Sequence, residues 1–360
     1  MKFRSDIQGL RAIAVLLVVI HHAFPKLMPG GFIGVDIFFV ISGFVISKLL
    51  VRDRKKPWRQ FFLDFYARRV RRILPSALLT IISTLVVSIF LLGTITGGDV
   101  ARDGIFAALF VANLHFNNIS IDYFASGLPQ PILQHFWSLA IEEQFYLVWP
   151  LLFYLASRKK NVPLIIVGLI TMFSFSYAIL QIQSGTGTAF FSSLTRIWEL
   201  AVGAALALMA RTRENRAISA GALIVLFAFA FWIKNGADFP GFMALLVVVT
   251  TAALIATSES SEWLKNRFLT YLGDLSYLIY LVHWPVLQIH YIYKGVEATN
   301  LEKCILLALI MLISASIHRW FENPIRYSPA LVRNSGFTVK LGLACTTICA
   351  LSLVMIRGSL

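Results

Sequence analysis

Eleven stretches of this chain are long and apolar enough to cross a lipid bilayer as helices. A spanning helix needs about 20 mostly apolar residues. Of the 360 residues, 58% are hydrophobic and only 14% carry charge. The eleven stretches are 8–25, 33–51, 75–94, 136–156, 163–181, 190–210, 217–234, 240–257, 270–293, 303–321 and 338–356. They predict an all-α, polytopic membrane bundle of about 10–11 transmembrane helices, and they exclude a water-soluble globular enzyme.

A twelfth apolar stretch, 104–114, is too short to span, and we expect it to lie at the interface or to re-enter the membrane. Asp6 and Arg11 interrupt the first stretch, and no small-residue cleavage pattern follows it. We therefore expect a retained first helix instead of a cleaved signal peptide. No internal repeat or soluble domain is visible. The expected organisation is one transmembrane domain over 1–335 and an additional C-terminal transmembrane helix over 336–360.

Lysine and arginine are distributed unevenly between the loops on the two sides of the expected bundle. With the N-terminus in the cytoplasm, 23 of the 32 fall in inner segments and 6 in outer ones. The remaining three, Arg11, Lys48 and Arg196, lie inside or at the edge of spans. This positive-inside bias predicts a multi-pass protein of the plasma membrane with a cytoplasmic N-terminus. Because the bias also explains the net charge of +14, membrane lipid is an expected partner and nucleic acid is not.

The first two spans carry ionisable residues that are costly in lipid, and each is therefore a functional candidate. Eleven residues advance a helix by three turns plus ~20°, which places Arg11 and His22 on one face, about 16 Å apart. Asp36 enters the second span at a depth similar to that of His22, so the two side chains could touch. A carboxylate there would fix the tautomer of the imidazole and raise its basicity. Ser42 is explained as well by close packing of small residues between helices.

Further ionisable residues lie in the fourth, sixth and ninth spans. Glu142 follows His135 in the motif HFWSLAIEEQFY, and His283 lies deep in YLIYLVHWPV. Arg196 and Glu199 are three residues apart, a spacing that permits an ion pair within one helix. The alternative for each residue is a buried structural pair. Their number favours a shared polar cavity, which would also include His22.

Four arginines stand close together before the third span, in FYARRVRRILP. Three interpretations remain open, namely anchoring at the inner membrane surface, binding of anionic lipid, and docking of a phosphorylated ligand. Three cysteines lie in apolar runs, and no cysteine–histidine cluster suggests a metal, so neither a disulfide nor a metal site is expected. The four arginines are Arg68, Arg69, Arg71 and Arg72.

Taken in order, these motifs resemble the membrane acyltransferase family 3, the bacterial O-acyltransferases of surface polysaccharides. The motifs are Arg11-x10-His22, GVDIFFVISGF, FYARRVRRILP, FWSLAIEEQFY, TRIWELAVG, LSYLIYLVHWPV and FENPIR, and they run from about residue 3 to residue 327. The resemblance implies transfer of an acyl group, usually acetyl, from cytoplasmic acyl-CoA to a hydroxyl of an extracytoplasmic glycan such as O-antigen, peptidoglycan or exopolysaccharide. Acyl-CoA would be a donor substrate, and no bound cofactor is implied.

The resemblance, together with the positions of the remaining polar residues in the spans, suggests roles for individual residues. The catalytic group would comprise His22, Asp36 and Glu142. The acyl-CoA-binding group would comprise Arg11, Arg68, Arg69, Arg71 and Arg72. The acceptor or cavity group would comprise Ser42, His135, Arg196, Glu199 and His283. This sequence departs from the family pattern at Asn323, where arginine is more common. Members with an eleventh span also commonly continue into an extracytoplasmic SGNH-type domain, whereas this sequence ends at Leu360.

Two other classes of function compete with the enzyme. Intramembrane His, Asp and Glu also form proton relays in transporters, but transporters usually show internal repeats. A non-catalytic scaffold explains the spans but not the alignment of Arg11 with His22. The sequence leaves open whether His22 activates the acceptor hydroxyl or carries the acyl group itself. It also leaves open the acceptor, the acyl chain and the oligomeric state.

Overall fold

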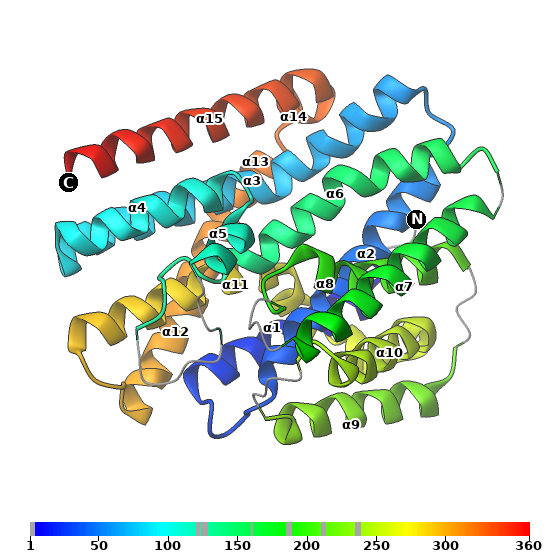
Figure 1. Cartoon of the computed structure of the whole chain (residues 1–360), viewed down its shortest axis with the longest axis horizontal. Coiled ribbons are helices and arrows are strands. Elements are labelled where there is room, and N and C mark those ends of the chain that lie inside the picture. Colours follow the sequence, from blue (N-terminus) through cyan, green and yellow to red (C-terminus); the bar gives the residue numbers. More distant parts are fainter. Residues whose placement is uncertain are drawn as a thin grey trace. The chain divides into compact units, whose positions relative to one another are not determined.

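A computed structural model of the chain describes residues 4–119, 123, 129–159, 161–184, 189–209, 214–234 and 239–360. Lys2, Lys160, Arg211 and Arg213, which contribute to the charge bias, lie outside the described residues. The described part is built of helices joined by short connections, and it contains no strand (Figure 1). The expected all-α class is therefore confirmed.

The helices follow the apolar stretches of the sequence closely. In chain order they are α1 Ser5–Ala23, η1 Gly31–Ile33, α2 Gly34–Asp53, α3 Trp58–Leu92, α4 Thr94–Ala108, α5 Ala112–Asn118, α6 Phe136–Ala156, α7 Val162–Gln183, α8 Ser193–Met209, α9 Arg216–Trp232, α10 Phe242–Thr257, η2 Ser258–Ser260, η3 Glu262–Lys265, α11 Arg267–Lys294, α12 Asn300–Ile317, η4 His318–Glu322, α13 Asn323–Arg326, α14 Pro329–Arg333 and α15 Ser335–Ser359. Each of the eleven predicted stretches falls on one of these helices.

Six helices of the described part are long and apolar enough to cross a membrane. They are Ser5–Ala23, Gly31–Asp53, Trp58–Leu92, Val162–Gln183, Asn300–Arg326 and Ser335–Ser359. Two shorter apolar helices, Arg216–Trp232 and Phe242–Thr257, add to them. A chain with this many apolar helices is a multi-pass membrane protein.

Two regions differ from the sequence prediction. α3 begins at Trp58 instead of residue 75, so the arginine-rich stretch continues the same helix through Pro75. Hydropathy missed this extension because a basic amphipathic stretch can be helical without being apolar. The stretch 104–114 is divided between the end of α4 and the start of α5, and Phe110 adopts a left-handed φ of 54° in the turn between them.

The described chain divides into two compact units, each with its own packing. The first comprises 1–55, 117–125 and 141–277, and the second comprises 56–116, 126–140 and 278–360. Within the second unit, α15 packs along α3 and α4 (Figure 1). Gly342 of α15 lies against the side chains of Val70 and Leu74 in α3. A domain boundary at residue 335 stays a prediction.

In the first unit, α1 and α2 pack with their backbones in close contact and run in opposite directions. A Cβ atom added to Gly31 would lie 2.3 Å from the carbonyl oxygen of Leu17. One added to Gly34 would lie 2.2 Å from the carbonyl oxygen of Ala14. Since residue numbers rise along one helix as they fall along the other, the short turn returns α2 beside α1, as expected.

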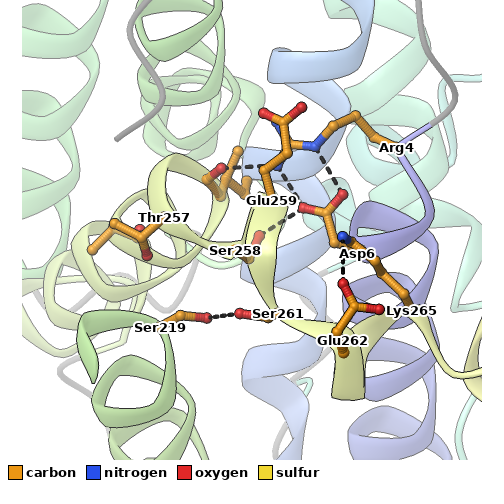
Figure 2. Close-up of polar contacts among 11 residues, drawn as sticks. Arg4, Asp6, Ser219, Thr257, Ser258, Glu259, Ser261, Glu262 and Lys265 are labelled. Carbon is orange, nitrogen blue, oxygen red and sulfur yellow. Dashed lines mark hydrogen bonds and ion pairs between the residues drawn. The ribbon is translucent and has the colours of Figure 1, made fainter. Parts of the chain in front are cut away.

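The start of α1 is held by a buried polar network (Figure 2). Arg4 donates from Nε to Asp6 at 2.8 Å and from Nη2 to the carbonyl oxygen of Ile255 at 3.1 Å. Ser258 donates to the second carboxylate oxygen of Asp6 at 2.7 Å, and Glu259 lies 3.6 Å from Arg4 Nη1. Asp6 is buried and fully paired. The network therefore fixes the helix that carries Arg11 and His22.

The contacts of α2 with α6 show that these two helices run in the same direction. Ser42 of α2 bonds to Glu142 of α6, and Trp149 of α6 bonds to Ser47 of α2. Residue numbers therefore rise together along both helices. The second and fourth predicted spans cross in the same direction if every span reverses the chain, so this pairing agrees with the predicted alternation.

A close approach of α2 to α8 at a glycine gives a stability prediction. A Cβ atom added to Gly43 would lie 1.9 Å from the carbonyl oxygen of Leu200. The backbone of α8 cannot shift away from this clash without a cost in free energy. We expect Gly43→Ala to destabilise the protein by about 1–3 kcal/mol or more, because the helices must separate. Gly168→Ala on α7 is the matched control, since nothing lies within 4 Å of its added Cβ.

Thermal unfolding of the detergent-purified variants measures this effect. The expected result is a lower midpoint for Gly43→Ala and an unchanged or slightly higher one for Gly168→Ala, because alanine favours helices. Equal midpoints for the two variants would show that the α2–α8 contact tolerates a methyl group.

Candidate functional site

A buried ion-pair triad joins α2 to α8. Arg196 Nη1 lies 3.1 Å from Glu199 Oε1, and Arg196 Nη2 lies 3.1 Å from Asp36 Oδ1. All three side chains have no solvent exposure. The predicted pair between Arg196 and Glu199 is therefore confirmed. The contact with His22 that similar depth allowed is not formed, because Asp36 pairs with Arg196, and opposite charges attract strongly where water is excluded.

Three phenylalanine rings surround the guanidinium of Arg196. Its Cζ lies 5.5 Å from the ring centre of Phe39 and 5.3 Å from those of Phe190 and Phe239. All three rings are buried. Cation–π attraction is strongest where water is absent, so these rings lower the cost of burying the charge. They also fix the position of the guanidinium between the two carboxylates.

His22 lies near the end of α1 and contacts Tyr123. Its Nε2 is 3.3 Å from the phenolic oxygen of Tyr123, and the two rings meet nearly edge to face with centres 6.5 Å apart. The Tyr123 ring stacks on Phe190 at 4.0 Å. Tyr123 thus links the imidazole of His22 to the aromatic rings around Arg196. Sequence analysis missed this tyrosine because it lies in a polar connecting stretch without a helical pattern.

The polar contact between α2 and α6 contains two predicted site residues. Ser42 donates to Glu142 Oε1 at 2.6 Å, and Tyr146 donates to Glu142 Oε2 at 3.4 Å. The Glu142 carboxylate therefore lies at the contact between α6 and α2. The serine is therefore a partner of the carboxylate as well as a small residue at a helix contact.

Arg11 lies on the same uninterrupted helix as His22, so their predicted placement on one face follows from the geometry of α1. Its Nη1 donates to Gln8 Oε1 at 3.1 Å. Arg11 is only half-buried, in contrast to Arg196. A guanidinium with some exposure can exchange protein contacts for contacts with an anionic ligand.

The second unit contains the arginine cluster on α3. Arg69 is buried, whereas Arg68, Arg71 and Arg72 are half-buried. The same helix begins with a paired acidic group, since Asp64 accepts hydrogen bonds from Lys56 at 2.7 Å and from Ser335 of α15 at 2.8 Å. Asp64 also interacts electrostatically with Arg68 and Arg71 of the cluster.

The second unit also brings two predicted histidines together. The ring centres of His135 and His283 are 5.9 Å apart, and both side chains are buried. Tyr280 donates to the carbonyl oxygen of His135 at 3.1 Å and lies 2.6 Å from the hydroxyl of Ser138. His283 Nδ1 lies 2.6 Å from the carbonyl oxygen of Tyr280, which can only accept, so this nitrogen carries a hydrogen. A cavity shared by His283 and His22 stays a prediction.

The fold and these clusters define an all-α membrane protein that holds ionisable side chains within its helices. The chain belongs to the acyltransferase family, because the family profile described as "Acyltransferase domain" matches residues 4–319. The predicted family is thereby confirmed. No solved structure matches the chain.

Several curated relatives are similar over most of the chain. Peptidoglycan O-acetyltransferase OatA of Listeria monocytogenes is 31% identical and aligns with 94% of this chain and 58% of its own length. The putative peptidoglycan O-acetyltransferase YrhL of Bacillus subtilis is 33% identical and aligns with 90% of this chain and 55% of its own length. O-acetyltransferase OatA of Staphylococcus aureus is 30% identical and aligns with 90% of this chain and 57% of its own length. The chain thus spans little more than half the length of these relatives.

The triad gives a second stability prediction. Arg196→Met would leave Asp36 and Glu199 buried without their cation, and breaking a buried pair in this way costs about 3–5 kcal/mol. Glu199→Gln should cost less, because Arg196 keeps Asp36 as its counter-ion. Arg216→Met, at an exposed position, is the control. Denaturation of the purified variants ranks their stabilities. An Arg196→Met variant as stable as Arg216→Met would show that the triad contributes nothing to stability.

Proposed function

We propose that this protein transfers an acetyl group from acetyl-CoA to a hydroxyl group of peptidoglycan. The main structural support is the contact between His22 Nε2 and a hydroxyl group, that of Tyr123, on the helix that also carries Arg11. Membership in the acyltransferase family supports the reaction class. The names of the relatives from Listeria monocytogenes and Bacillus subtilis support peptidoglycan over other glycans.

His22 acts as general base in the proposed reaction. A sugar hydroxyl is a weak nucleophile at neutral pH, so its proton must leave as its oxygen attacks. The hydroxyl proton moves to Nε2 while the oxygen bonds to the thioester carbonyl carbon. The carbon–sulfur bond then breaks, and the CoA thiolate leaves and recovers the proton from the imidazolium. A positioned base of this kind typically contributes 10²–10⁴-fold to the rate.

The other candidates take separate roles in this proposal. Asp36 is assigned to the triad that joins α2 and α8, in place of its expected role beside His22. Glu142 positions α6 against α2 through Ser42 and remains a catalytic candidate. Arg11 attracts the anionic donor from the helix that carries the base. The buried His135–His283 pair of the second unit remains a candidate for lining a cavity.

The donor is proposed to bind at the arginine cluster of α3 from the cytoplasmic side. Guanidinium groups form strong, paired hydrogen bonds to phosphate oxygens. The positive-inside bias supports a cytoplasmic N-terminus, and the same bias places the cluster on the side where acyl-CoA is made. Acetyl-CoA acts as substrate, without a bound cofactor, and the protein is proposed to lie in the plasma membrane.

The first functional prediction concerns His22. We expect His22→Ala to lose about 10²–10⁴-fold in acetyl transfer, because the base is removed, while donor binding remains. His21→Ala is the matched control, since its ring bonds to the carbonyl oxygen of Met28. His283→Ala tests the rival base in the second unit. Transfer rates at equal expression decide between them. An active His22→Ala beside an inactive His283→Ala would place the base on α11.

The second functional prediction concerns donor binding. Each charge-assisted hydrogen bond contributes about 1.5–3 kcal/mol, so Arg69→Ala and Arg72→Ala should each lower the affinity for acetyl-CoA about tenfold or more. Arg59→Ala is the control, because Arg59 is exposed on the same helix. Calorimetric titration of purified, folded variants measures the affinity. Equal affinities in all three variants would assign the cluster to membrane anchoring.

A further inference from the structure

Asp64 lies on the same face of α3 as two arginines of the cluster. Arg68 and Arg71 follow it by four and seven residues, and seven residues of an α-helix complete about two turns. The three side chains therefore form one row along the helix. Both guanidinium groups attract the Asp64 carboxylate electrostatically. A negative charge thus lies beside arginines that are proposed to bind a negatively charged donor.

Two hydrogen bonds hold this carboxylate in place. Lys56 donates to Oδ2 of Asp64 at 2.7 Å, and Ser335 donates to Oδ1 at 2.8 Å. Ser335 is the first residue of α15, so its bond joins the start of this helix to α3. The two helices also meet closely at Gly342, where an added Cβ atom would lie 2.7 Å from Cγ1 of Val70. The packing of α15 therefore determines where the carboxylate lies.

Arg71 has hydrogen-bond donors that the described residues do not use. Its Nε and Nη1 atoms are buried, and neither donates to an atom of the described part of the chain. A buried charged donor without an acceptor is costly, and the oxygen atoms of an anionic ligand would supply acceptors. This observation is independent of Asp64, and it points to an anion beside the row that Asp64 begins.

We propose that Asp64 is a positioning residue that lowers the affinity of the arginine cluster for donor phosphate groups, because its carboxylate competes with them for Arg68 and Arg71. The inference rests on the proposed binding of acetyl-CoA at this cluster. Ser335 restrains the carboxylate, so α15 determines how strongly it competes. Asp64 acts through the arginines and does not contact the donor.

Such competition keeps donor binding reversible. Acetyl-CoA and the product CoA carry the same phosphate groups, so arginines that bind the donor tightly also retain the product. A carboxylate beside the phosphate groups repels both ligands and occupies part of the positive potential of the cluster. Product can then leave and a new donor can bind.

Asp64→Asn tests the competition, because it removes the charge and keeps the size of the side chain and one acceptor oxygen. The affinity for acetyl-CoA should rise about twofold to tenfold, as expected for one charge acting near a protein surface. Calorimetric titration measures it. Asp99→Asn is the matched control, since it removes the same charge from an exposed ion pair with Arg102 on α4. The gain should shrink at about 1 M salt, where screening is strong.

Ser335→Ala should change the affinity in the opposite direction. It leaves the carboxylate charged but removes one of its two restraints, so Asp64 can approach the arginines and the affinity should fall about twofold or more. Ser359→Ala, at the other end of α15, is the control, because its hydroxyl bonds to the carbonyl oxygen of Ile356. When Asp64→Asn is combined with Ser335→Ala, the affinity should equal that of Asp64→Asn alone.

Changes of the same sign in the two single variants would mean that each loosens the contact between α3 and α15, and they would overturn the inference. Unchanged acetyl-CoA affinity in Asp64→Asn would overturn it as well. A change confined to stabilisation by the anionic lipid phosphatidylglycerol, with acetyl-CoA affinity unaltered, would also overturn it, because the cluster would then bind lipid headgroups.

Titration with inorganic pyrophosphate separates this inference from the proposed function. Pyrophosphate carries the anionic groups of the donor without its acetyl group, so its binding does not depend on turnover. Opposite changes in pyrophosphate affinity in Asp64→Asn and Ser335→Ala, in a protein that transfers no acetyl group, would support the competition and refute the proposed function. Acetyl transfer by the wild type together with equal pyrophosphate affinities in all variants would overturn the inference alone.

Discussion

The guanidinium of Arg196 is the charge around which the first unit is organised. A lone cation inside a bundle is costly, and here two carboxylates and three aromatic rings compensate it. One carboxylate comes from its own helix and the other from α2, so the compensation joins α2 to α8. Since α2 also packs closely on α1 and bonds to α6, the pairing of one charge determines where several helices lie.

Local features of the sequence predicted the helices and some of their contacts. Apolar length identified eleven stretches that are helical in the structure, and the spacing of Arg196 and Glu199 predicted their ion pair. Both features depend on residues near one another in the chain. The opposite directions of α1 and α2, and the shared direction of α2 and α6, also follow from a chain that reverses at every span.

Contacts between residues far apart in the sequence could not be predicted in the same way. Similar depth in the membrane allowed a contact between Asp36 and His22, but the Asp36 carboxylate pairs with Arg196. Asp36 and Arg196 are far apart in the sequence, so no sequence spacing could predict this pair. Hydropathy placed the start of α3 too late because it reports an apolar environment and not backbone conformation. Tyr123 escaped detection for a related reason, since it lies in a connecting stretch whose sequence shows no helical periodicity.

The triad and the His22–Tyr123 contact are two different kinds of polar contact within the first unit. In the triad, opposite charges pair at 3.1 Å without solvent exposure, and opening it would leave a buried charge uncompensated. His22 instead meets a neutral hydroxyl at 3.3 Å, beside a half-buried ring, and exchanging that hydroxyl for another leaves no buried charge behind. Phe190 belongs to both contacts, because its ring lies against the Arg196 guanidinium and stacks on Tyr123. The rings that stabilise the buried charge therefore also position the tyrosine beside His22.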